Sequence, residues 1–393
     1  SLRNIQRKEW GDGMRIGIVG AGPAGLYAAI LLKRSRPDAT IEIVDQNPPD
    51  ATWGFGVVFS SKALSFLRAS DPETADLIEP EMETWSDIAI VHRGETVTID
   101  GIGFSAIGRL RMLQLFQDRA SRLGITPHFN TRLESLEVFA DADLVIAADG
   151  LNSVVRAEDP SAFGESITLL DNRVVWVGCG GPFEAETQTF KQTAHGCMTA
   201  HHYRYAPDRS TFLIECEPKA FEQAGFEAMP EPERRAVLEQ IFRQELRGSA
   251  LVDNHSVWRQ FPVLKNERWY NGNRVLVGDA LHTAHFSIGS GTRLALEDVI
   301  ALVQALEATD FDVSAALPAY QAERQPVLEK LTKAALASAH WYEKFGEHMA
   351  LDPWPFALSY ILRAQRLDSS TLEKIAPEFS NGLRTRGLLE EAA

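Results

Sequence analysis

The chain has 393 residues and a formal net charge of −15, with 54 acidic and 39 basic side chains. A chain of this length can bury a large core and form two or three substructures. The acidic balance argues against nucleic acid and anionic membranes as main partners, because both repel a negatively charged protein. No apolar run approaches the roughly 20 residues that a membrane-spanning helix needs. We therefore expect a globular protein with neither a nucleic-acid nor a membrane partner.

The N-terminal residues and the cysteines add two expectations. Ser1–Gly13 is polar and has no apolar signal-peptide segment, so we expect a leader or an added extension outside the fold. Cys179, Cys197 and Cys216 fit neither zinc-binding nor Cys-x-x-Cys spacing, so no metal site is predicted. Their number suits a reducing, cytoplasmic location, and we expect buried small side chains rather than catalytic thiols.

One stretch near the N-terminus carries the strongest signal. Arg15–Val19 is typical of a short buried strand, and Gly20–Gly25 follows with the sequence Gly-Ala-Gly-Pro-Ala-Gly. An apolar helix is predicted over Pro23–Arg34, and a second strand over Ile41–Val44 ends at Asp45. Strand, glycines, helix, strand and acid in this order are the pattern of a dinucleotide-binding unit.

Each residue of this motif has a physical reason. Gly20 permits a tight turn, Gly22 lets the backbone approach a pyrophosphate, and Gly25 lets the helix pack against the strand. The helix N-terminus directs free N–H groups at the phosphates. Asp45 can accept hydrogen bonds from ribose hydroxyls. We predict dinucleotide binding here, and a glycine-rich turn without a ligand is the alternative.

Two features follow that permit more than one interpretation. Gly54 and Gly56 lie among aromatic residues, where the backbone can approach a flat ligand or form a loop that packs on the core. An amphipathic helix is predicted over Arg109–Leu123, and Arg109 at its start is either a ligand-binding or an ordinary surface residue. A helix over Ser61–Ala69 and a β-hairpin over residues 88–99 complete this region.

A second apolar strand, Asp143–Ala148, ends at Asp149-Gly150, and Arg156 follows on a short helix. A third, Asn273–Val277, ends at Gly278-Asp279. Carboxylates that follow strands of a doubly wound sheet lie at its carboxyl edge, where ligands bind. After the third strand come His285, Phe286, Gly289 and Gly291, and a helix begins near Arg293; its N-terminus suits an anionic or hydrogen-bonding edge of a ligand.

The middle of the chain changes character. Val174–Val177, Gln192–Tyr203 and Thr211–Glu215 are strand-like and predict an antiparallel sheet inserted into the first domain. A charged helix over Pro230–Leu246 and a strand over Trp258–Val263 follow. By period two, one face of the middle strand gathers His195, Cys197, Thr199, His201 and Tyr203, and His202 lies on the other. Parity alone leaves open which face lines a pocket.

The three motifs resemble, in their order, those of single-component FAD aromatic hydroxylases with the para-hydroxybenzoate hydroxylase fold. Gly20–Gly25 resembles the first glycine motif of that family, Asp149-Gly150 its Asp-Gly motif and Gly278-Asp279 its Gly-Asp motif. The resemblance covers the chain from Met14 to the C-terminal helices. Within the family, residues 53–60, 71–75 and 282–292 are most similar to salicylyl-CoA 5-hydroxylases and 2-aminobenzoyl-CoA monooxygenases. The tryptophan-derivative hydroxylases of violacein biosynthesis share much of residues 285–291.

The resemblance implies an α/β fold with an α+β insert. It consists of a Rossmann-like FAD-binding domain, an inserted antiparallel-sheet substrate domain and C-terminal helices. We expect the FAD-binding domain over residues 14–80, 101–170 and 268–310, the substrate domain over 81–100 and 171–267, and the helical region over 311–393. In the last region Trp341, Trp354 and Phe356 are expected to pack, and the tail after Leu367 to be loosely held.

The resemblance also assigns roles. Gly20, Gly22, Ala24 and Gly25 would hold the FAD pyrophosphate, and Asp45 the adenosine ribose. The other positions carried over as cofactor-binding are Gly54, Gly56, Val57, Arg109, Asp149, Gly150, Asp279, Gly289, Gly291 and Thr292. Phe286 departs from the family, which usually has a proline there, so the substrates of ordinary phenol hydroxylases are not assumed.

The implied chemistry is NADH- or NADPH-dependent reduction of FAD, addition of O₂ to give a flavin hydroperoxide, and hydroxylation of an electron-rich ring. A phenol or aniline substrate is activated by losing or sharing a proton. His285 and His201 are the candidate catalytic residues, with Tyr203 as a hydrogen-bonding partner; a purely structural role of His201 and Tyr203 in the sheet is the alternative.

The implied substrate is a small aromatic molecule, either a hydroxy- or aminobenzoyl thioester of CoA or a carrier protein, such as salicylyl-CoA, or a free indole derivative. A flavin reductase-type enzyme is the third alternative. A monomer or homodimer is expected. A CoA thioester needs cations at the pocket mouth, and the available ones are Arg204, Arg209, Arg259, Lys265 and Arg268.

Overall fold

The computed structural model describes residues 13–52, 54–181 and 183–389. The expected leader therefore lies outside the described residues apart from Gly13, and Trp53 does as well. The described chain forms three sheets and a group of C-terminal helices, so the predicted α/β architecture with an antiparallel insert is confirmed. No helix in these ranges is long and apolar enough to cross a membrane. We keep the predicted domain boundaries as a proposal.

The first sheet is parallel except at one edge. Its strands, in spatial order, are β15 (Tyr270–Asn271, antiparallel), β16 (Arg274–Leu276), β8 (Leu144–Ala147), β1 (Arg15–Val19) and β2 (Thr40–Val44). Val19 pairs with Ala147, and Ala147 pairs with Leu276. The carboxyl ends of β1, β8 and β16 therefore lie level with one another, which brings the three predicted motifs to one edge of the sheet.

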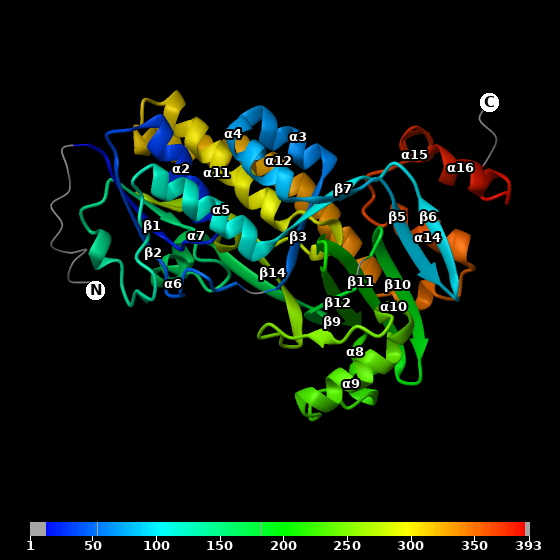
Figure 1. Ribbon diagram of the computed structural model, residues 1–393. Coiled ribbons are helices and arrows are strands. Elements are labelled where there is room, and N and C mark those ends of the chain that lie inside the picture. The colour runs from blue at the N-terminus through cyan, green and yellow to red at the C-terminus, as the bar shows by residue number, and fades with distance from the viewer. Residues whose placement is uncertain (1–12, 53, 182, 390–393) are drawn as a thin grey trace.

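Buried helices pack on this parallel sheet (Figure 1). The main ones are α2 (Pro23–Ser35), α5 (Arg109–Arg122) and α11 (Gly291–Ala308), and short helices lie at η2 (Glu137–Phe139), α6 (Val154–Glu158) and α7 (Pro160–Phe163). Leu26 and Ile30 of α2 are fully buried against Ile16 and Ile18 of β1. A helix that is apolar on nearly all sides is stable only when it is covered in this way.

The second sheet contains the predicted insert. Its strands, in spatial order, are β13 (Leu251–Val252), β9 (Glu165–Cys179), β12 (Arg209–Cys216), β11 (Gly196–Ala206), β10 (Glu186–Thr193), β5 (Ile88–His92) and β6 (Glu95–Ile99), and β14 (Arg259–Asn266) pairs with β9. The predicted hairpin over residues 88–99 is confirmed as β5–β6. We call this sheet the substrate sheet, after the role that the resemblance implies for it.

Two predictions in this region are wrong. Gln192–Tyr203 is not one strand: β10 ends at Thr193, a turn carries His195, and β11 begins at Gly196. The turn contains Gly196 with φ +126° but neither a proline nor an Asn-Gly pair, so the sequence did not reveal the reversal. The predicted helix Pro230–Leu246 is also broken, at Phe242, into α9 (Glu231–Ile241) and α10 (Arg243–Leu246).

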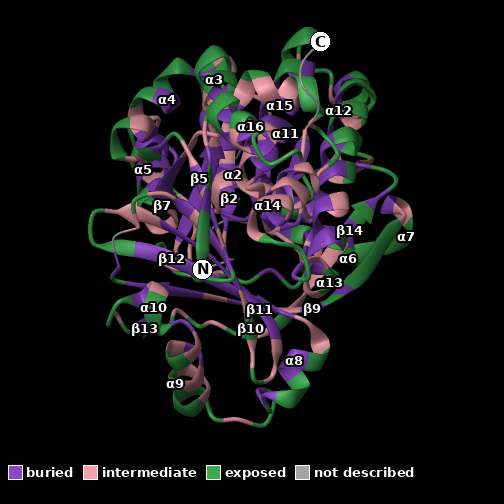
Figure 2. Cartoon of the chain, turned by 90° about the vertical axis from the view of Figure 1, so that its right-hand side faces the viewer, coloured by how far each residue is buried: buried purple, intermediate pink, exposed green. Residues whose placement is uncertain are grey.

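The two faces of β11 have different neighbours. Met198 and Ala200 belong to the apolar cluster on the outer face, with α8 (Pro218–Gln223), α9 and α10. Cys197 belongs to the cluster formed with the C-terminal helices. Figure 2 shows that α9 is a mixture of exposed and half-buried residues, whereas β11 and β12 are mostly buried. The face that carries His201 is therefore the inner face of the substrate sheet.

A small third sheet connects the two larger ones. It consists of β3 (Gly56–Ser60), β7 (Phe104–Gly108) and β4 (Glu83–Trp85), and α3 (Ser61–Ser70), α4 (Pro72–Ile78) and η1 (Glu79–Glu81) lie beside it. Asp71 is buried and accepts hydrogen bonds from Arg119 of α5 and Arg34 of α2, both at 2.9 Å. The segment 71–75 thus ties three helices together.

The C-terminal helices are α12 (Val313–Tyr342), α13 (Phe345–His348), α14 (Pro353–Leu362), α15 (Ser369–Ile375) and α16 (Pro377–Arg384). The prediction that the tail after Leu367 is loosely held is wrong. Leu372, Phe379 and Leu383 are buried in one cluster with the hairpin β5–β6. Asp100, which follows β6, accepts a hydrogen bond from the Phe379 N–H at 2.8 Å. The tail covers the apolar face of this hairpin.

Candidate active site

The glycine turn between β1 and α2 is tightly closed on one side and open on another. Gly20 has φ +101°, and a Cβ there would lie 2.3 Å from the Ala148 carbonyl oxygen. A Cβ on Gly25 would lie 1.9 Å from the Gly20 carbonyl oxygen. A Cβ on Gly22 would have no atom within 4 Å. Gly20 and Gly25 are thus required by the packing of the protein itself, whereas the space beside Gly22 is available to a ligand.

Asp45 lies directly beside this turn. One of its carboxylate oxygens accepts a hydrogen bond from the Ala21 N–H at 2.6 Å, and the other from the Asn47 N–H at 2.7 Å. These two bonds fix the orientation of the carboxylate and leave each oxygen a second lone pair. Asp45 is therefore held where it can accept hydrogen bonds from a ribose.

Asp149 carries an unsatisfied atom at the same sheet edge. Its Oδ2 accepts a hydrogen bond from the Val154 N–H at 2.7 Å, but its buried Oδ1 has no hydrogen-bond partner. Burial raises the pKa of this carboxyl. A Cβ on Gly150 would have no atom within 4 Å. Because buried polar atoms are nearly always paired, the orphaned oxygen indicates a missing ligand donor.

Arg109 and Asp279 face each other at the third motif. Asp279, in η3 (Gly278–Ala280), is solvent-accessible, and desolvation by the surrounding protein raises the pKa of its carboxyl. Arg109 interacts electrostatically with Asp279 and Arg259, and burial lowers its pKa. The Arg109 guanidinium has no hydrogen bond or ion pair to any described residue. A half-buried, unpaired guanidinium suits a phosphate.

The segment with Gly54, Gly56 and Val57 is fixed to the substrate sheet. The Gly56 N–H donates to the Thr211 hydroxyl at 2.9 Å, and the Tyr203 hydroxyl donates to the Gly56 carbonyl oxygen at 2.9 Å. Gly54 packs on Trp176 and its carbonyl accepts from Asn254, and Val57 is buried in β3. Burial raises the pKa of Tyr203, so its hydroxyl remains a donor.

Replacing Tyr203 by phenylalanine is expected to cost about 1 kcal/mol of unfolding free energy, because the Gly56 carbonyl loses its donor while the ring packing stays. Urea denaturation measures the difference. Tyr205 lies on the same strand, and its hydroxyl makes no hydrogen bond to a described residue. Tyr205→Phe is the matched control and should leave the stability within about 0.5 kcal/mol. Equal losses in both variants would contradict this account.

The loop after Asp279 contributes the remaining predicted residues. It contains η4 (Phe286–Ile288), and Gly289 packs against Val58 of β3. Gly291 and Thr292 form the first turn of α11, and a Cβ on Gly291 would have no atom within 4 Å. The open N-terminus of this helix lies next to the segment held by Tyr203.

Taken together, the predicted cofactor residues form one edge that fits FAD. Gly22, Gly150 and Gly291 leave open space, Asp149 has an orphaned oxygen, and Arg109 is unpaired. Among the described residues no group of three or more His, Cys, Asp or Glu side chains is placed to hold a metal. The individual roles of these residues toward FAD stay predictions.

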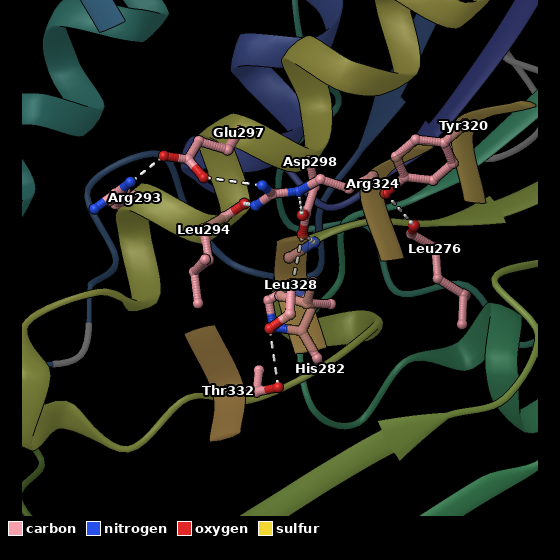
Figure 3. A network of polar contacts seen from close by, with 11 residues as sticks. Leu276, His282, Arg293, Leu294, Glu297, Asp298, Tyr320, Arg324, Leu328 and Thr332 are labelled. Carbon is pink, nitrogen blue, oxygen red and sulfur yellow. Dashed lines mark hydrogen bonds and ion pairs between the residues drawn. The ribbon is translucent and has the colours of Figure 1, made fainter. Parts of the chain in front are cut away.

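A polar network holds the third motif in place (Figure 3). Asp298 of α11 accepts hydrogen bonds from His282 at 2.7 Å, from the Gly278 N–H at 3.2 Å and from Arg324 of α12 at 2.9 Å. Arg324 also donates to Glu297. Burial opposes ionisation of Asp298, but His282 and Arg324 outweigh it and lower the pKa of this carboxyl.

The two predicted catalytic histidines belong to one connected group of side chains, which we call the wall and which also contains Glu186, Gln188 and Tyr342. His201 is buried, and its Nε2 lies 2.8 Å from Glu186 Oε1. Its cross-strand neighbour Gln188 accepts a hydrogen bond from the Tyr342 hydroxyl at 3.0 Å. The Tyr342 ring lies 6.1 Å from the ring of His285. The substrate sheet, helix α12 and the loop after Asp279 meet here.

His285 is buried among aromatic rings. Its ring centroid lies 5.0 Å from that of Phe261 and 4.1 Å from that of Phe286. Burial and the charge of Arg363 lower the pKa of His285 to about 3. Arg363 itself donates to the Ser287 carbonyl at 2.7 Å and lies 3.7 Å above the Tyr360 ring.

Sequence reasoning missed four residues of this wall: Glu186, Gln188, Tyr342 and Arg363. The first two lie on β10 at positions that precede the predicted strand Gln192–Tyr203, so their pairing with His201 could not be predicted. Of the five cations proposed for CoA phosphates, Arg204 pairs with Glu83 and Arg268 binds backbone carbonyls. Arg259 and Lys265 have no ion pair within the described ranges.

Comparison with known proteins agrees with this geometry. A family model described as an FAD binding domain matches residues 114–335. Salicyloyl-CoA 5-hydroxylase of Streptomyces sp is 36% identical over 361 residues, which cover 89% of this chain and 70% of that protein. The 3-hydroxy-4-methyl-anthranilyl-(aryl-carrier protein) 5-monooxygenase of Streptosporangium sibiricum is 35% identical over 331 residues, with 84% and 90% covered.

Two further similarities complete the comparison. Protodeoxyviolaceinate monooxygenase of Chromobacterium violaceum is 31% identical, and the match covers 90% of this chain and 95% of that protein. The crystal structure of a variant of 2-methyl-3-hydroxypyridine-5-carboxylic acid oxygenase has a TM-score of 0.70, 17% identity and coverage of 94% and 98%, which shows the common fold. With the sheet edge that fits FAD and these relatives, the chain belongs to the FAD-binding aromatic hydroxylases and is a flavin monooxygenase.

Proposed function

We propose that this flavin monooxygenase hydroxylates the ring of a hydroxy- or aminobenzoyl group that is bound as a thioester to CoA or to a carrier protein. The observation that carries the proposal is that the two relatives at 36% and 35% identity are both named for aromatic acyl thioesters, and the matches span 89% and 84% of this chain. Salicylyl-CoA, hydroxylated at position 5, is the specific substrate that we propose.

The geometry supports an aromatic ring next to the flavin. Phe261, Phe286 and Tyr342 surround His285 with apolar faces, which exclude water from the ligand. Next to this apolar region, His201 and Glu186 provide a polar end for a ring hydroxyl or amino group. A ligand that is apolar on its faces and carries one acidic group at its edge matches this wall.

The thioester end would lie toward the cations that have no partner among the described residues. Arg259 interacts electrostatically with Arg109 and Asp279, and Lys265 is exposed on the same strand β14. The phosphates of CoA or of a pantetheine arm bind such side chains.

FAD, when bound, supplies the reduction and the oxygen chemistry, and NADH or NADPH is the usual co-substrate of this family. The chain itself orients the ring, excludes water and manages one proton. We propose a cytoplasmic enzyme, in keeping with its three buried, unpaired cysteines.

A second candidate substrate is a free indole derivative. The 31% identity to protodeoxyviolaceinate monooxygenase, with 90% of this chain covered, favours it. In that case the thioester part is absent, and the two unpaired cations of β14 have no role in substrate binding.

Stopped-flow flavin reduction tests the proposal. NADH or NADPH is mixed with the FAD-bound enzyme, with or without salicylyl-CoA, and the aerobic product is weighed by mass spectrometry. Strong acceleration by the thioester and one added oxygen are expected. Acceleration only by free indole or tryptophan derivatives would select the second candidate. If no aromatic ligand accelerates flavin reduction or gains an oxygen, both candidate substrates are excluded and a flavin reductase-type activity remains.

A further inference from the structure

Glu186 and His201 form a buried pair on the inner face of the substrate sheet. Glu186 lies on β10 and His201 on β11, and 2.8 Å separates Oε1 from Nε2. Two residues further on the same face, Tyr203 donates to the Gly56 carbonyl of the segment expected beside the flavin. The pair therefore lies between that segment and the C-terminal helices.

The hydrogen bond to Glu186 fixes which nitrogen of His201 holds the proton. A carboxylate oxygen only accepts, so the Nε2–H donates to it, and Nδ1 of the neutral ring carries the lone pair. Nδ1 has no hydrogen-bond partner among the described residues. A free imidazole nitrogen backed by a carboxylate is the arrangement of a general base, because the carboxylate stabilises the imidazolium that forms.

In His285 it is the other ring nitrogen, Nδ1, that is hydrogen-bonded to the protein. The backbone N–H of Ser287 donates to its Nδ1 at 3.4 Å, and the Ser287 hydroxyl lies 2.8 Å from the same atom. A backbone N–H can only donate, so Nδ1 is the acceptor and the proton of the neutral ring lies on Nε2. Since its pKa is lowered to about 3, His285 stays neutral near pH 7. It is suited to donate a hydrogen bond rather than to take a proton.

The two histidines belong to one continuous wall. Tyr342 packs beside His285 and donates to Gln188, which is the cross-strand neighbour of His201. A ligand against this wall meets a hydrogen-bond donor at one end and a proton acceptor at the other. This polarity is complementary to a ring that carries a carbonyl and an acidic hydroxyl.

We propose that His201 is the catalytic residue that takes the proton of the ring hydroxyl of the substrate, and that Glu186 is the positioning residue that orients it. The ligand O–H bond breaks, a new N–H bond forms at Nδ1, and the electron pair stays on the oxygen as a phenolate. The imidazolium remains hydrogen-bonded to Glu186, and the proton returns when the product leaves. An amino group shares its proton in the same hydrogen bond. The assignment rests on the proposed function.

The other titratable groups around His201 keep their charge near neutral pH, except Glu215 on β12, whose pKa burial raises to about 8. Burial raises the pKa values of Tyr203 on β11, Tyr342 on α12 and Tyr360 on α14, so all three stay neutral. Burial lowers the pKa of His202, on the opposite face, to about 3. Ionisation of a bound phenol therefore reports on the pair Glu186–His201.

The test uses the oxidised, FAD-bound enzyme with salicylyl-CoA and no reductant, and it follows the phenolate absorbance of the bound ligand against pH. In the wild type we expect the bound phenol to ionise at lower pH than the free ligand. In Glu186→Gln the midpoint should rise by about one pH unit, which is a tenfold decrease in the ionisation constant of the bound phenol. In His201→Gln the bound phenol should ionise at the same pH as the free ligand. Glu186→Asp keeps a carboxylate, so its midpoint should lie between those of the wild type and Glu186→Gln.

Glu215→Gln is the matched control. Glu215 is a buried carboxyl on the neighbouring strand β12, its pKa is raised to about 8 by burial, and Asn172 donates to it. At pH 7 Glu215 is mostly neutral, so its amide variant changes no charge there and should leave the ionised fraction of the bound phenol at pH 7 unchanged. Thermal unfolding and flavin content confirm that each variant is folded.

Two outcomes would overturn the assignment. If the bound phenol ionises equally in the wild type and in the Glu186 and His201 variants, or if only His285→Asn abolishes the ionisation, the pair is not the proton acceptor. These results leave the proposed function intact. If salicylyl-CoA does not perturb the flavin spectrum of the wild type at all, the proposed function fails and the assignment fails with it.

Discussion

Replacing Asp298 by alanine is expected to lower the unfolding free energy by about 3–5 kcal/mol, the usual cost of removing one member of a buried ion pair. Asp298 is fully buried, and its loss leaves His282 and Arg324 buried without their shared carboxylate (Figure 3). The Gly278 N–H loses its acceptor as well. Urea denaturation of the apo protein measures the change, and a loss below about 1 kcal/mol would contradict it.

The same carboxylate predicts a pH dependence. Its pKa is lowered in the folded protein, so its contribution is fully present above the ordinary aspartate pKa and is lost as the pH falls through the folded value. The wild type should therefore lose stability in acid more steeply than Asp298→Asn, which has no charge to lose. Glu297→Gln is the control, because it also touches Arg324 but does not contact His282 or Gly278. If the unfolding free energies of the wild type and Asp298→Asn fall equally with pH in acid, Asp298 is not the origin of the acid sensitivity.

Gly22→Ala is expected to weaken FAD binding at least tenfold, about 1.4 kcal/mol, and to leave the apo protein as stable as the wild type. Gly22 has φ −72°, which alanine adopts freely, and the new methyl group meets no protein atom within 4 Å. The methyl group therefore occupies only the space that we assign to the pyrophosphate. Titration of the apo protein with FAD, followed by flavin fluorescence, gives the affinity.

Gly25→Ala separates packing from ligand contact. Alanine in a helix normally stabilises it by up to about 1 kcal/mol relative to glycine. Here the Cβ would lie 1.9 Å from the Gly20 carbonyl, so the apo protein itself should lose about 1–3 kcal/mol. If Gly22→Ala destabilised the apo protein as much as Gly25→Ala, the open space at Gly22 would not be a ligand site.

The sequence predicted that the three motifs lie at one edge of the parallel sheet, because their signals are local. A buried strand followed at once by Asp149 or Asp279 fixes where the carboxylate lies, since parallel strands end at one sheet edge. The glycines of the first turn are read in the same way. None of these inferences requires the pairing of distant segments.

The residues around His201 and His285 could not be predicted, because their contacts depend on the pairing of segments that are distant in the sequence. His201 meets Glu186 only because the chain turns back between Thr193 and Gly196, and no glycine-asparagine pair or proline signals that turn. The burial of the tail also depends on distant residues. Leu372 and Phe379 look like an exposed, interrupted pattern until the hairpin β5–β6, about 280 positions earlier, provides an apolar face for them.

The strand order of the parallel sheet has a consequence for how the protein is made. Strand β16 enters the sheet between β15 and β8, and β8 in turn separates it from β1, although the chain reaches Arg274 long after Val19. A ribosome adds about 5–20 residues per second, so roughly 14 to 55 s pass between the synthesis of Arg15 in β1 and that of Gly291 in α11. During this interval the nascent chain has no complete nucleotide edge. Flavin uptake must therefore follow the synthesis of β16 and α11, which complete this edge of the sheet.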